Sequence, residues 1–273
     1  MNLVHANLIT CLKDGTCSDV CPMNLIPLGE GGIPTPVANI DGLCIRCGHC
    51  VAVCATDSLT HSEISLGAGN SLQKEWLWSA EQMEQIFRSR RSIRNYRDQP
   101  VPRETLQRLF DTVSFAPSAH NTQGAEWQVI THPEELSRLS GLVGEWMRWM
   151  LDNKPIIAMS VHLDEALERM ESGENIILRG APVLIIAHGR KDDQMASTTC
   201  TIALSHLELA ATGMALGACW AGYFNVAARN YPPMQEALNL PKGHICQGAM
   251  VLGFPKYPYH RFPERKAPVI TWR

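Results

Sequence analysis

Closely spaced cysteines near the N-terminus are the residues of this chain best suited to chemistry. Seven of the ten cysteines precede residue 55, and four of them form the run Cys44-x2-Cys47-x2-Cys50-x3-Cys54. This spacing wraps three thiolates around one face of a cubane iron–sulfur cluster, whereas zinc sites usually place a longer arm between two cysteine pairs. The fourth cysteine of such a run points towards a second cluster. The run therefore predicts an iron–sulfur cluster and requires a second set of ligands, with zinc or free thiols as the alternative.

A second run supplies those ligands. Cys11, Cys17 and Cys21 repeat the spacing, and Asp14 stands where the second cysteine is expected. The expected ligand sets cross over between the two runs. One set is Cys44, Cys47, Cys50 and Cys21, and the other is Cys11, Cys17, Cys54 and Asp14. Residues 1–65 thus resemble the bacterial ferredoxins that carry two 4Fe-4S clusters.

Asp14 leaves the nature of the second cluster open. Its carboxylate can ligate iron directly, or it can stand beside the open corner of a 3Fe-4S cluster. An oxygen ligand would change the charge and the reduction potential of the cluster. The alternative is a solvated turn residue, because Asp14-Gly15 is a turn signal. The ferredoxin pattern is also broken at Ala55, where those proteins have a proline after the last cysteine.

A run of arginines later in the chain suits anion binding. Residues 88–97 contain five arginines in ten positions, although the formal net charge of the chain is -3. Guanidinium groups bind phosphate through two parallel hydrogen bonds, so the run predicts a cofactor that carries a phosphate. A solvated helix face or a nucleic-acid patch is the alternative. The net charge gives no general attraction to nucleic acids or membranes, and we expect neither as a partner.

Further motifs follow the arginine run in a fixed order. They lie at 116–123, 180–182, 213–222 and 253–255. Together with residues 90–94, they resemble the motifs of the nitroreductase family of FMN enzymes, over residues 80–273. The resemblance implies an α+β domain, in which helices flank a central sheet, and a homodimer that binds FMN at its interface. One departure is the stretch 124–126, which stands where the family often has Pro-Trp directly after the glutamine.

The resemblance also assigns the flavin contacts. Arg90 and Ser92 would contact the phosphate and the ribityl chain, joined by Arg265. Arg94 would lie at the pyrimidine side of the ring system, where a positive charge favours the anionic reduced flavin. The complete set of expected cofactor contacts is Arg90, Arg91, Ser92, Arg94, Pro117, Ser118, Ala119, Asn121, Gln123, Cys219, Trp220, Ala221, Gly222, Arg261 and Arg265.

Two parts of that set have distinct expected roles. The loop at 117–121 would reach the flavin of the partner subunit, and the backbone at 220–222 would contact the ring around N5. His120, inside the loop, could donate a proton to the substrate because a histidine pKa lies near neutrality. A packing or solvent-facing role for His120 is the alternative.

Local signals place these motifs on secondary-structure elements. Residues 79–82 form a capping box that opens a helix, and a second helix begins near Pro102. Buried strands are expected at 127–130 and 183–187, and a long helix at about 195–216. We therefore expect an iron–sulfur domain over 1–65, a connector over 66–78 and an FMN domain over 79–273.

Iron–sulfur ligands and a flavin site in one chain predict an oxidoreductase. We expect electrons to pass through the clusters to FMN and then to a small organic acceptor, such as a nitroaromatic compound, a quinone or an enone. The chain lacks a G-x-G-x-x-G dinucleotide fingerprint, so a low-potential donor such as ferredoxin is expected. The alternatives are a flavin dehydrogenase running in reverse and a non-catalytic redox sensor or electron store. No secretory signal is visible, so we expect a cytoplasmic protein.

Overall fold

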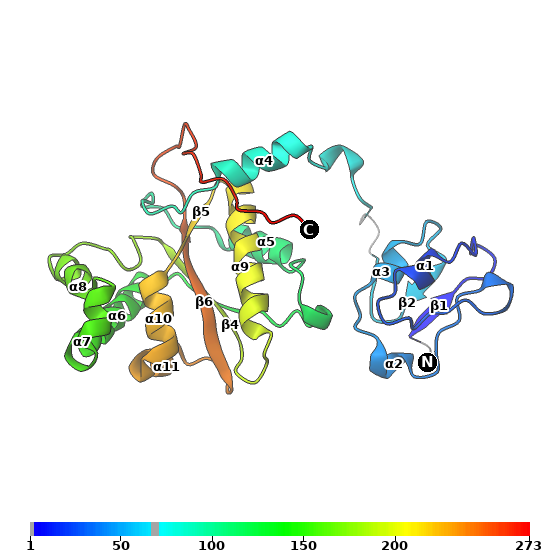
Figure 1. Ribbon diagram of the computed structural model, residues 1–273, viewed down its shortest axis with the longest axis horizontal. Helices are drawn as coiled ribbons and strands as arrows, with labels where there is room; N and C mark the ends of the chain where they lie inside the picture. The colour runs from blue at the N-terminus through cyan, green and yellow to red at the C-terminus, as the bar shows by residue number, and fades with distance from the viewer. Residues whose placement is uncertain (1–2, 67–70) are drawn as a thin grey trace. The chain divides into compact units, whose positions relative to one another are not determined.

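The chain folds into two compact units, described by a computed structural model over residues 3–66 and 71–273 (Figure 1). The first unit comprises residues 1–77 and 120–122, and the second comprises 78–119 and 123–273. The expected connector at 66–78 contains the 3-10 helix η2 (Lys74–Trp76), and its residues 67–70 lie outside the described residues. The three expected domain ranges stay predictions.

The first unit has short elements around a small core. Strands β1 (Val4–Ala6) and β2 (Leu59–His61) pair antiparallel, with Val4 opposite His61. The helices are α1 (Thr16–Asp19), η1 (Glu30–Gly32), α2 (Ile40–Leu43) and α3 (His49–Ala52). The core residues include Val4, Leu25, Ile26, Val51, Leu59 and the buried Cys17 and Cys50. So small a core is typical of a domain whose stability depends on bound metal.

The two cysteine runs share one backbone conformation. Gly15 precedes α1 and Gly48 precedes α3, with φ angles of 79° and 74°. Glycine suits this left-handed conformation because it has no Cβ. Lys13 and Arg46, each two residues before the glycine, also have positive φ angles, of 58° and 53°. The repeat in cysteine spacing is therefore also a structural repeat.

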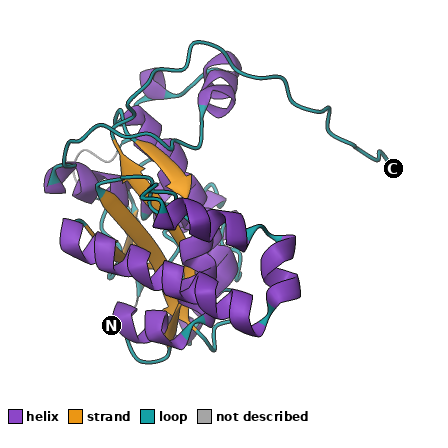
Figure 2. Ribbon diagram, turned by 90° about the vertical axis from the view of Figure 1, so that its left-hand side faces the viewer, coloured by secondary structure: helices purple, strands orange, loops and turns teal. Residues whose placement is uncertain are grey.

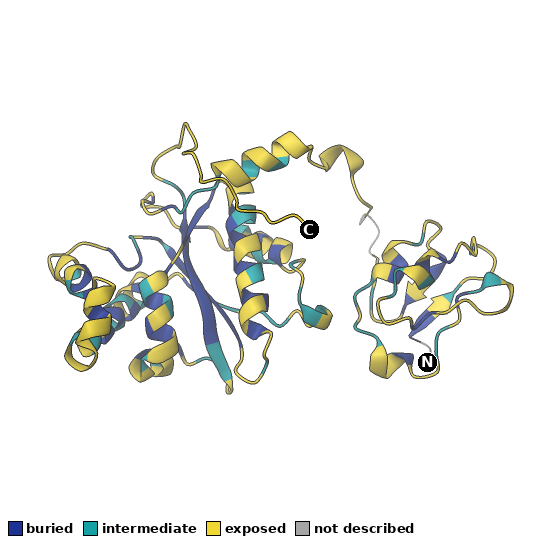
Figure 3. Cartoon of the chain, in the orientation of Figure 1, coloured by how far each residue is buried: buried dark blue, intermediate teal, exposed yellow. Residues whose placement is uncertain are grey.

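A four-stranded antiparallel sheet lies at the centre of the second unit, in the order β3-β4-β6-β5. The strands are β3 (Glu126–Ile130), β4 (Val183–Arg190), β5 (Gly217–Trp220) and β6 (His244–Gly253). The two central strands, β4 and β6, are buried along nearly their whole length (Figure 3). Burial on both faces of these strands requires helices on both sides of the sheet.

Helices cover both faces of the sheet (Figure 1). The α-helices of the second unit are α4 (Ala80–Ser89), α5 (Arg103–Val113), α6 (Pro133–Asn153), α7 (Pro155–Ser160), α8 (Leu163–Glu171), α9 (Ala196–Gly213), α10 (Gly222–Asn230) and α11 (Pro232–Leu238). Val183 and Ile185 of β4 share a core with α5 and α9, whereas Leu184 and Ile186 share one with α6, α8, α10 and α11. This alternation follows from the opposite directions of successive side chains in a strand. The predicted α+β fold with helices around a central sheet is confirmed.

The structure also tests the local signals. The Ser79 side chain accepts a hydrogen bond from the backbone N–H of Gln82, which confirms the capping box of α4. The helices expected after Pro102 and near residue 195 are α5 and α9. The strands expected at 127–130 and 183–187 are both present but longer, as β3 (Glu126–Ile130) and β4 (Val183–Arg190). β6, which no signal predicted, is the longest of the described strands. No helix within the described residues is long and apolar enough to cross a membrane.

Candidate iron–sulfur and flavin sites

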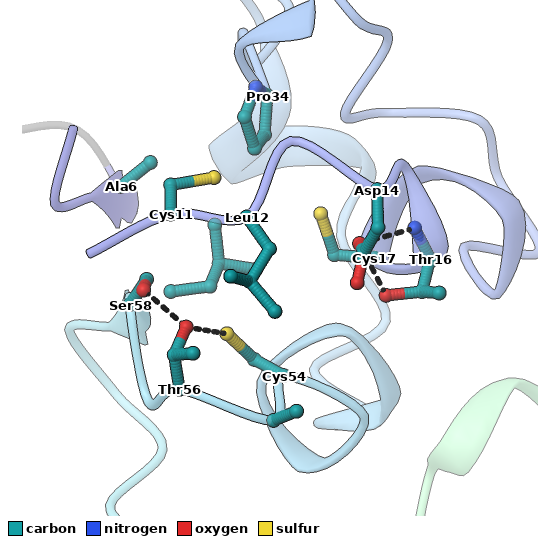
Figure 4. Close-up of a pocket in the computed structure, with 12 residues that line it drawn as sticks. Ala6, Cys11, Leu12, Asp14, Thr16, Cys17, Pro34, Cys54, Thr56 and Ser58 are labelled. Carbon is teal, nitrogen blue, oxygen red and sulfur yellow. Dashed lines mark hydrogen bonds between the residues drawn. The ribbon is translucent and has the colours of Figure 1, made fainter. Parts of the chain in front are cut away.

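One pocket of the first unit brings together ligands from both cysteine runs. Its lining includes Cys11, Asp14, Cys17 and Cys54, which are the members of one expected ligand set. Figure 4 shows the three thiol groups directed towards a common space between their segments. Cys17 lies at the start of α1, after the left-handed Gly15, and Cys54 follows α3. A donor set of three thiols and one carboxylate fits an iron–sulfur cluster.

Asp14 lies on the wall of this pocket and makes a local turn. Its Oδ1 atom accepts hydrogen bonds from the backbone N–H of Thr16 at 3.1 Å and from the Thr16 hydroxyl at 2.9 Å (Figure 4). The bonds from Thr16 lower the pKa of the Asp14 carboxyl, so this group is an anion near neutral pH. Asp14 therefore makes the turn contact and also lies beside three cysteines. Ligation of iron by Asp14 stays a prediction.

A second pocket holds the other cysteine set. Cys21, Cys44, Cys47 and Cys50 all line it. Two of these sulfurs accept backbone hydrogen bonds at 3.4 Å, Cys21 from the N–H of Leu25 and Cys44 from the N–H of Arg46. Such N–H donors stabilise thiolates and tune the potential of a cluster. Burial raises the pKa of Cys50 to about 11, so its thiolate form requires the charge of a bound metal.

His61 is a residue of this pocket that the sequence did not reveal. It is buried, and its Nδ1 atom accepts a hydrogen bond from the backbone N–H of Glu63 at 3.1 Å. In a neutral imidazole the proton then resides on Nε2, which lies 3.8 Å from the Cys44 sulfur. Burial lowers the pKa of His61, and this favours the neutral ring. His61 is 17 residues beyond Cys44, and no spacing pattern links the two.

A cavity of about 500 Å³ lies in the second unit. Four expected flavin contacts line it: Arg94, Cys219, Trp220 and Gly222. Its other lining residues are mainly apolar and come from α6, α7, α8, α10, β6 and the segment before β4. Arg179, which the sequence did not reveal, adds a second positive charge. The size, the apolar walls and the two guanidinium groups fit the ring system of FMN.

A short strap of chain carries Arg94 to this cavity. The N–H of Ile93 donates to the carbonyl of Ala218 in β5 at 2.9 Å, and the hydroxyl of the buried Tyr96 donates to the carbonyl of Ile93 at 2.6 Å. The strap lies so close to β5 that a Cβ at Gly217 would approach Ile93 Cγ1 to 2.3 Å. The N–H of Arg97 also donates to the carbonyl of Phe254 at 2.9 Å, so Arg94 lies between two hydrogen-bonded points of the strap.

Two further arginines of the expected flavin set are bonded to protein groups. Arg90 Nη1 donates to Glu208 Oε1 of α9 at 2.7 Å. Arg91 donates to the carbonyls of Arg90 and Arg88. Neither Arg90, Arg91 nor Ser92 is among the residues that line the 500 Å³ cavity. Phosphate contacts by these residues stay predictions, and no motif had pointed to Glu208 as a partner of Arg90.

The loop and tail residues of the expected flavin set lie apart from this cavity's lining. Ser118 Oγ accepts a hydrogen bond from the N–H of Gln123 at 2.8 Å. His120 and Asn121, in the 3-10 turn η3 (Ala119–Asn121), have left-handed φ angles of 50° and 53°, and His120 is exposed. The last segment leaves β6 without helix or strand (Figure 2). Further expected contacts are Pro117, Ala119, Ala221 and the exposed Arg261 and Arg265. Their roles stay predictions.

Comparisons with known proteins agree with this arrangement. Residues 87–254 match the nitroreductase family, and residues 9–58 match a 4Fe-4S dicluster domain. A protein of Thermus thermophilus named NADH dehydrogenase is 26% identical over 204 residues, which cover 67% of this chain and 92% of that protein. An FMN reductase [NAD(P)H] of Bacillus subtilis is 27% identical over 178 residues, which cover 63% of this chain and 67% of that protein.

Solved structures share the fold of the second unit. A nitroreductase with bound FMN from Bacteroides fragilis has a TM-score of 0.59 at 22% identity, with 70% of this chain and 97% of that chain covered. A nitroreductase with bound FMN from Desulfitobacterium hafniense has a TM-score of 0.54 at 19% identity, with 69% and 97% covered. The family match spans more than half of the 273 residues, so the chain belongs to the nitroreductase family and also carries a 4Fe-4S dicluster domain.

Proposed function

We propose that this protein is an FMN-dependent oxidoreductase that receives electrons through two iron–sulfur clusters and reduces a small organic acceptor. The acceptor is a nitroaromatic compound, a quinone, an enone or a similar molecule. The observation that carries the proposal is the sorting of eight ligand candidates into two pockets, each lined by one crossed set. Two sets of iron–sulfur ligands in one chain are typical of a protein that transfers electrons one at a time.

The first unit would hold the clusters. Cys21, Cys44, Cys47 and Cys50 would bind one 4Fe-4S cluster, with backbone N–H groups donating to two of the sulfurs. Cys11, Cys17 and Cys54 would bind the other, which is a 4Fe-4S cluster if Asp14 ligates iron and a 3Fe-4S cluster if it does not. The hydrogen bonds to sulfur differ between the two sets, so the two clusters would have different potentials.

The second unit would bind the flavin. When bound, FMN exchanges single electrons with a donor and transfers an electron pair to an organic acceptor. Arg94 and Arg179 would hold the pyrimidine side of the ring, and their charges favour the reduced anion. Trp146 and Met150 of α6 would cover the ring and exclude water. The FMN in the solved relatives and the FMN reductase among the sequence relatives support this role.

The direction of electron flow has two candidates. A low-potential donor such as a ferredoxin fits the clusters, and the organic acceptor would then take electrons from the flavin. The reverse flow, a flavin dehydrogenase that exports electrons through the clusters, is favoured by the Thermus relative named NADH dehydrogenase. We propose the first direction, because the cluster ligands form an entry point for single electrons. We also propose a homodimer, which the resemblance to the nitroreductase family implies.

Anaerobic purification followed by turnover tests the proposal. We expect about eight irons and one FMN per chain, or about seven irons if Asp14 does not ligate iron. The protein reduced by a low-potential donor should be reoxidised faster by a panel of nitroaromatics, quinones and enones than in buffer alone. Reoxidation at the buffer rate with every acceptor would instead identify a redox sensor or an electron store. Sedimentation of the purified protein measures its molecular mass in solution, which should be that of a dimer.

A further inference from the structure

Three possible metal ligands meet at one end of the central sheet. Glu126 begins β3, His188 lies near the end of β4, and His244 begins β6. One donor atom from each lies within 4.8 Å of the other two. None of the three belongs to the iron–sulfur pockets or lines the 500 Å³ cavity. Their grouping is therefore not explained by the proposed redox cofactors.

The register of the strands explains why these side chains share one face. Glu126 is directly opposite His188, so both point to the same side of the sheet. His188 is opposite Cys246, and His244 is two residues before Cys246 on the same strand. Side chains two residues apart in a strand share a face, which makes His244 the diagonal neighbour of His188. A bulge between Ala187 and His188 sets this alignment.

The distances between the donor atoms suit a single ion. The Nδ1 atoms of His188 and His244 are 3.1 Å apart, and Glu126 Oε2 lies 4.0 Å and 3.8 Å from them. Ligands of a tetrahedral zinc ion, at their usual bond lengths, are about 3.3 Å apart. The two histidines already have this separation. The carboxylate reaches it through a small rotation, which its exposed position allows.

Burial gives the site a closed side and an open side. The side chains of His188 and His244 are only 5% and 10% exposed, whereas that of Glu126 is 57% exposed. Two imidazole nitrogens 3.1 Å apart either share a proton in a hydrogen bond or direct two lone pairs at a bound cation. A cation would satisfy both nitrogens and the carboxylate, and the side next to Glu126 would admit a water molecule as the remaining ligand.

We propose that Glu126, His188 and His244 bind one divalent transition-metal ion of the zinc type. Imidazole nitrogens and one carboxylate are a ligand set that zinc accepts, with the fourth position left to water. The ion would link the ends of three adjacent strands. Glu126 lies in the stretch 124–126, where the sequence departs from the nitroreductase pattern, so the site would be a feature of this chain rather than of the flavin machinery.

Zinc binding to the complete protein, with its iron and flavin loaded, tests the proposal. Zinc chloride is titrated against a chelating indicator, with the His188→Gln/His244→Gln double variant and Glu126→Gln measured alongside the unchanged chain. We expect the unchanged chain to bind about one zinc more than the double variant. Glu126→Gln should bind at least about tenfold more weakly, because a neutral amide replaces the anionic ligand.

A matched control is available at the N-terminus of α8. His162 Nδ1 and Glu165 Oε1 are 3.4 Å apart and both exposed, so they form a histidine–carboxylate pair that lacks the third ligand. His162→Gln should leave zinc binding unchanged. Iron and flavin contents and circular dichroism verify that each variant is folded. Equal zinc uptake by the unchanged chain and the double variant would overturn the proposal, and so would undiminished affinity in Glu126→Gln, whose exposed side chain is not needed for folding.

Discussion

Arg90 and Glu208 form a half-buried ion pair that joins two distant parts of the second unit. Arg90 Nη1 and Glu208 Oε1 are 2.7 Å apart, although the residues are 118 positions apart in sequence. The side chains are 26% and 12% exposed. Arg90 directly follows α4 as its C-cap, and Glu208 lies within α9. The pair therefore fixes the arginine run against the long helix that supports the sheet.

This pair predicts unequal effects of its two partners. Arg90→Ala should lower the free energy of unfolding by about 2 kcal/mol, because it leaves a nearly buried carboxylate unpaired, and it should also lower FMN retention. Glu208→Gln keeps a neutral acceptor for Arg90, so it should cost about 1 kcal/mol and leave FMN bound. Urea unfolding and the flavin-to-protein ratio report the two quantities.

The control for this pair is the neighbouring Arg88. Its contact with Glu84 is 3.6 Å long and exposed, so Arg88→Ala should change stability by less than about 0.5 kcal/mol. Full flavin occupancy in Arg90→Ala would contradict the assigned phosphate role and would return a nucleic-acid role for the arginine run to consideration.

His61 should raise the potential of the cluster in the second pocket. A donor to the Cys44 sulfur stabilises the more negative reduced cluster, so its loss makes the cluster harder to reduce. We expect His61→Leu to lower the midpoint potential by about 40 mV, the equivalent of about 1 kcal/mol for one electron. A redox titration followed by EPR measures the shift. His5→Leu, on the exposed side of β1, is the control, and equal potentials in both variants would refute the role.

Gly217 should be intolerant of any side chain. A Cβ there would meet Ile93 Cγ1 at 2.3 Å and Pro255 Cγ at 3.0 Å, and the strap that carries Arg94 would have to move. We expect Gly217→Ala to destabilise the protein by about 1–3 kcal/mol and to weaken FMN binding. Gly141→Ala meets no atom within 4 Å and lies inside α6, so it should be neutral or slightly stabilising. Equal thermal stability of the two variants would disprove the packing argument.

Cys200 and Cys246 of the second unit should be inert while the protein is folded. Burial raises the pKa of Cys200 to about 11 and that of Cys246 to about 12, and both are almost completely inaccessible. A raised pKa disfavours the thiolate, so at pH 8 about one thiol in a thousand or fewer is reactive. Iodoacetamide at pH 8 should label neither residue before unfolding, as read by mass spectrometry. Rapid labelling of either residue in the folded chain would show that it is reactive.

Features that depend on local sequence patterns could be predicted, whereas features that depend on long-range contacts could not. The capping box at Ser79 and the cysteine spacing are local, and the structure gathers the cysteines into the two expected groups. β6 was missed because its apolar residues, at 245–246 and 249–252, show no period that separates a buried strand from a buried helix. His61, Arg179 and Glu208 were missed because each acquires its partner only when distant segments fold together.

Electrons are expected to reach the flavin through the clusters. The most direct test is the anaerobic rate of flavin reduction by a reduced low-potential ferredoxin in the unchanged chain and in Cys47→Ser, which removes one expected ligand of the second pocket. We expect equal flavin contents and at least about tenfold slower reduction in the variant, with NADH a poorer donor than ferredoxin for the unchanged chain. Equal rates in both proteins, or equally fast reduction by NADH, would contradict it.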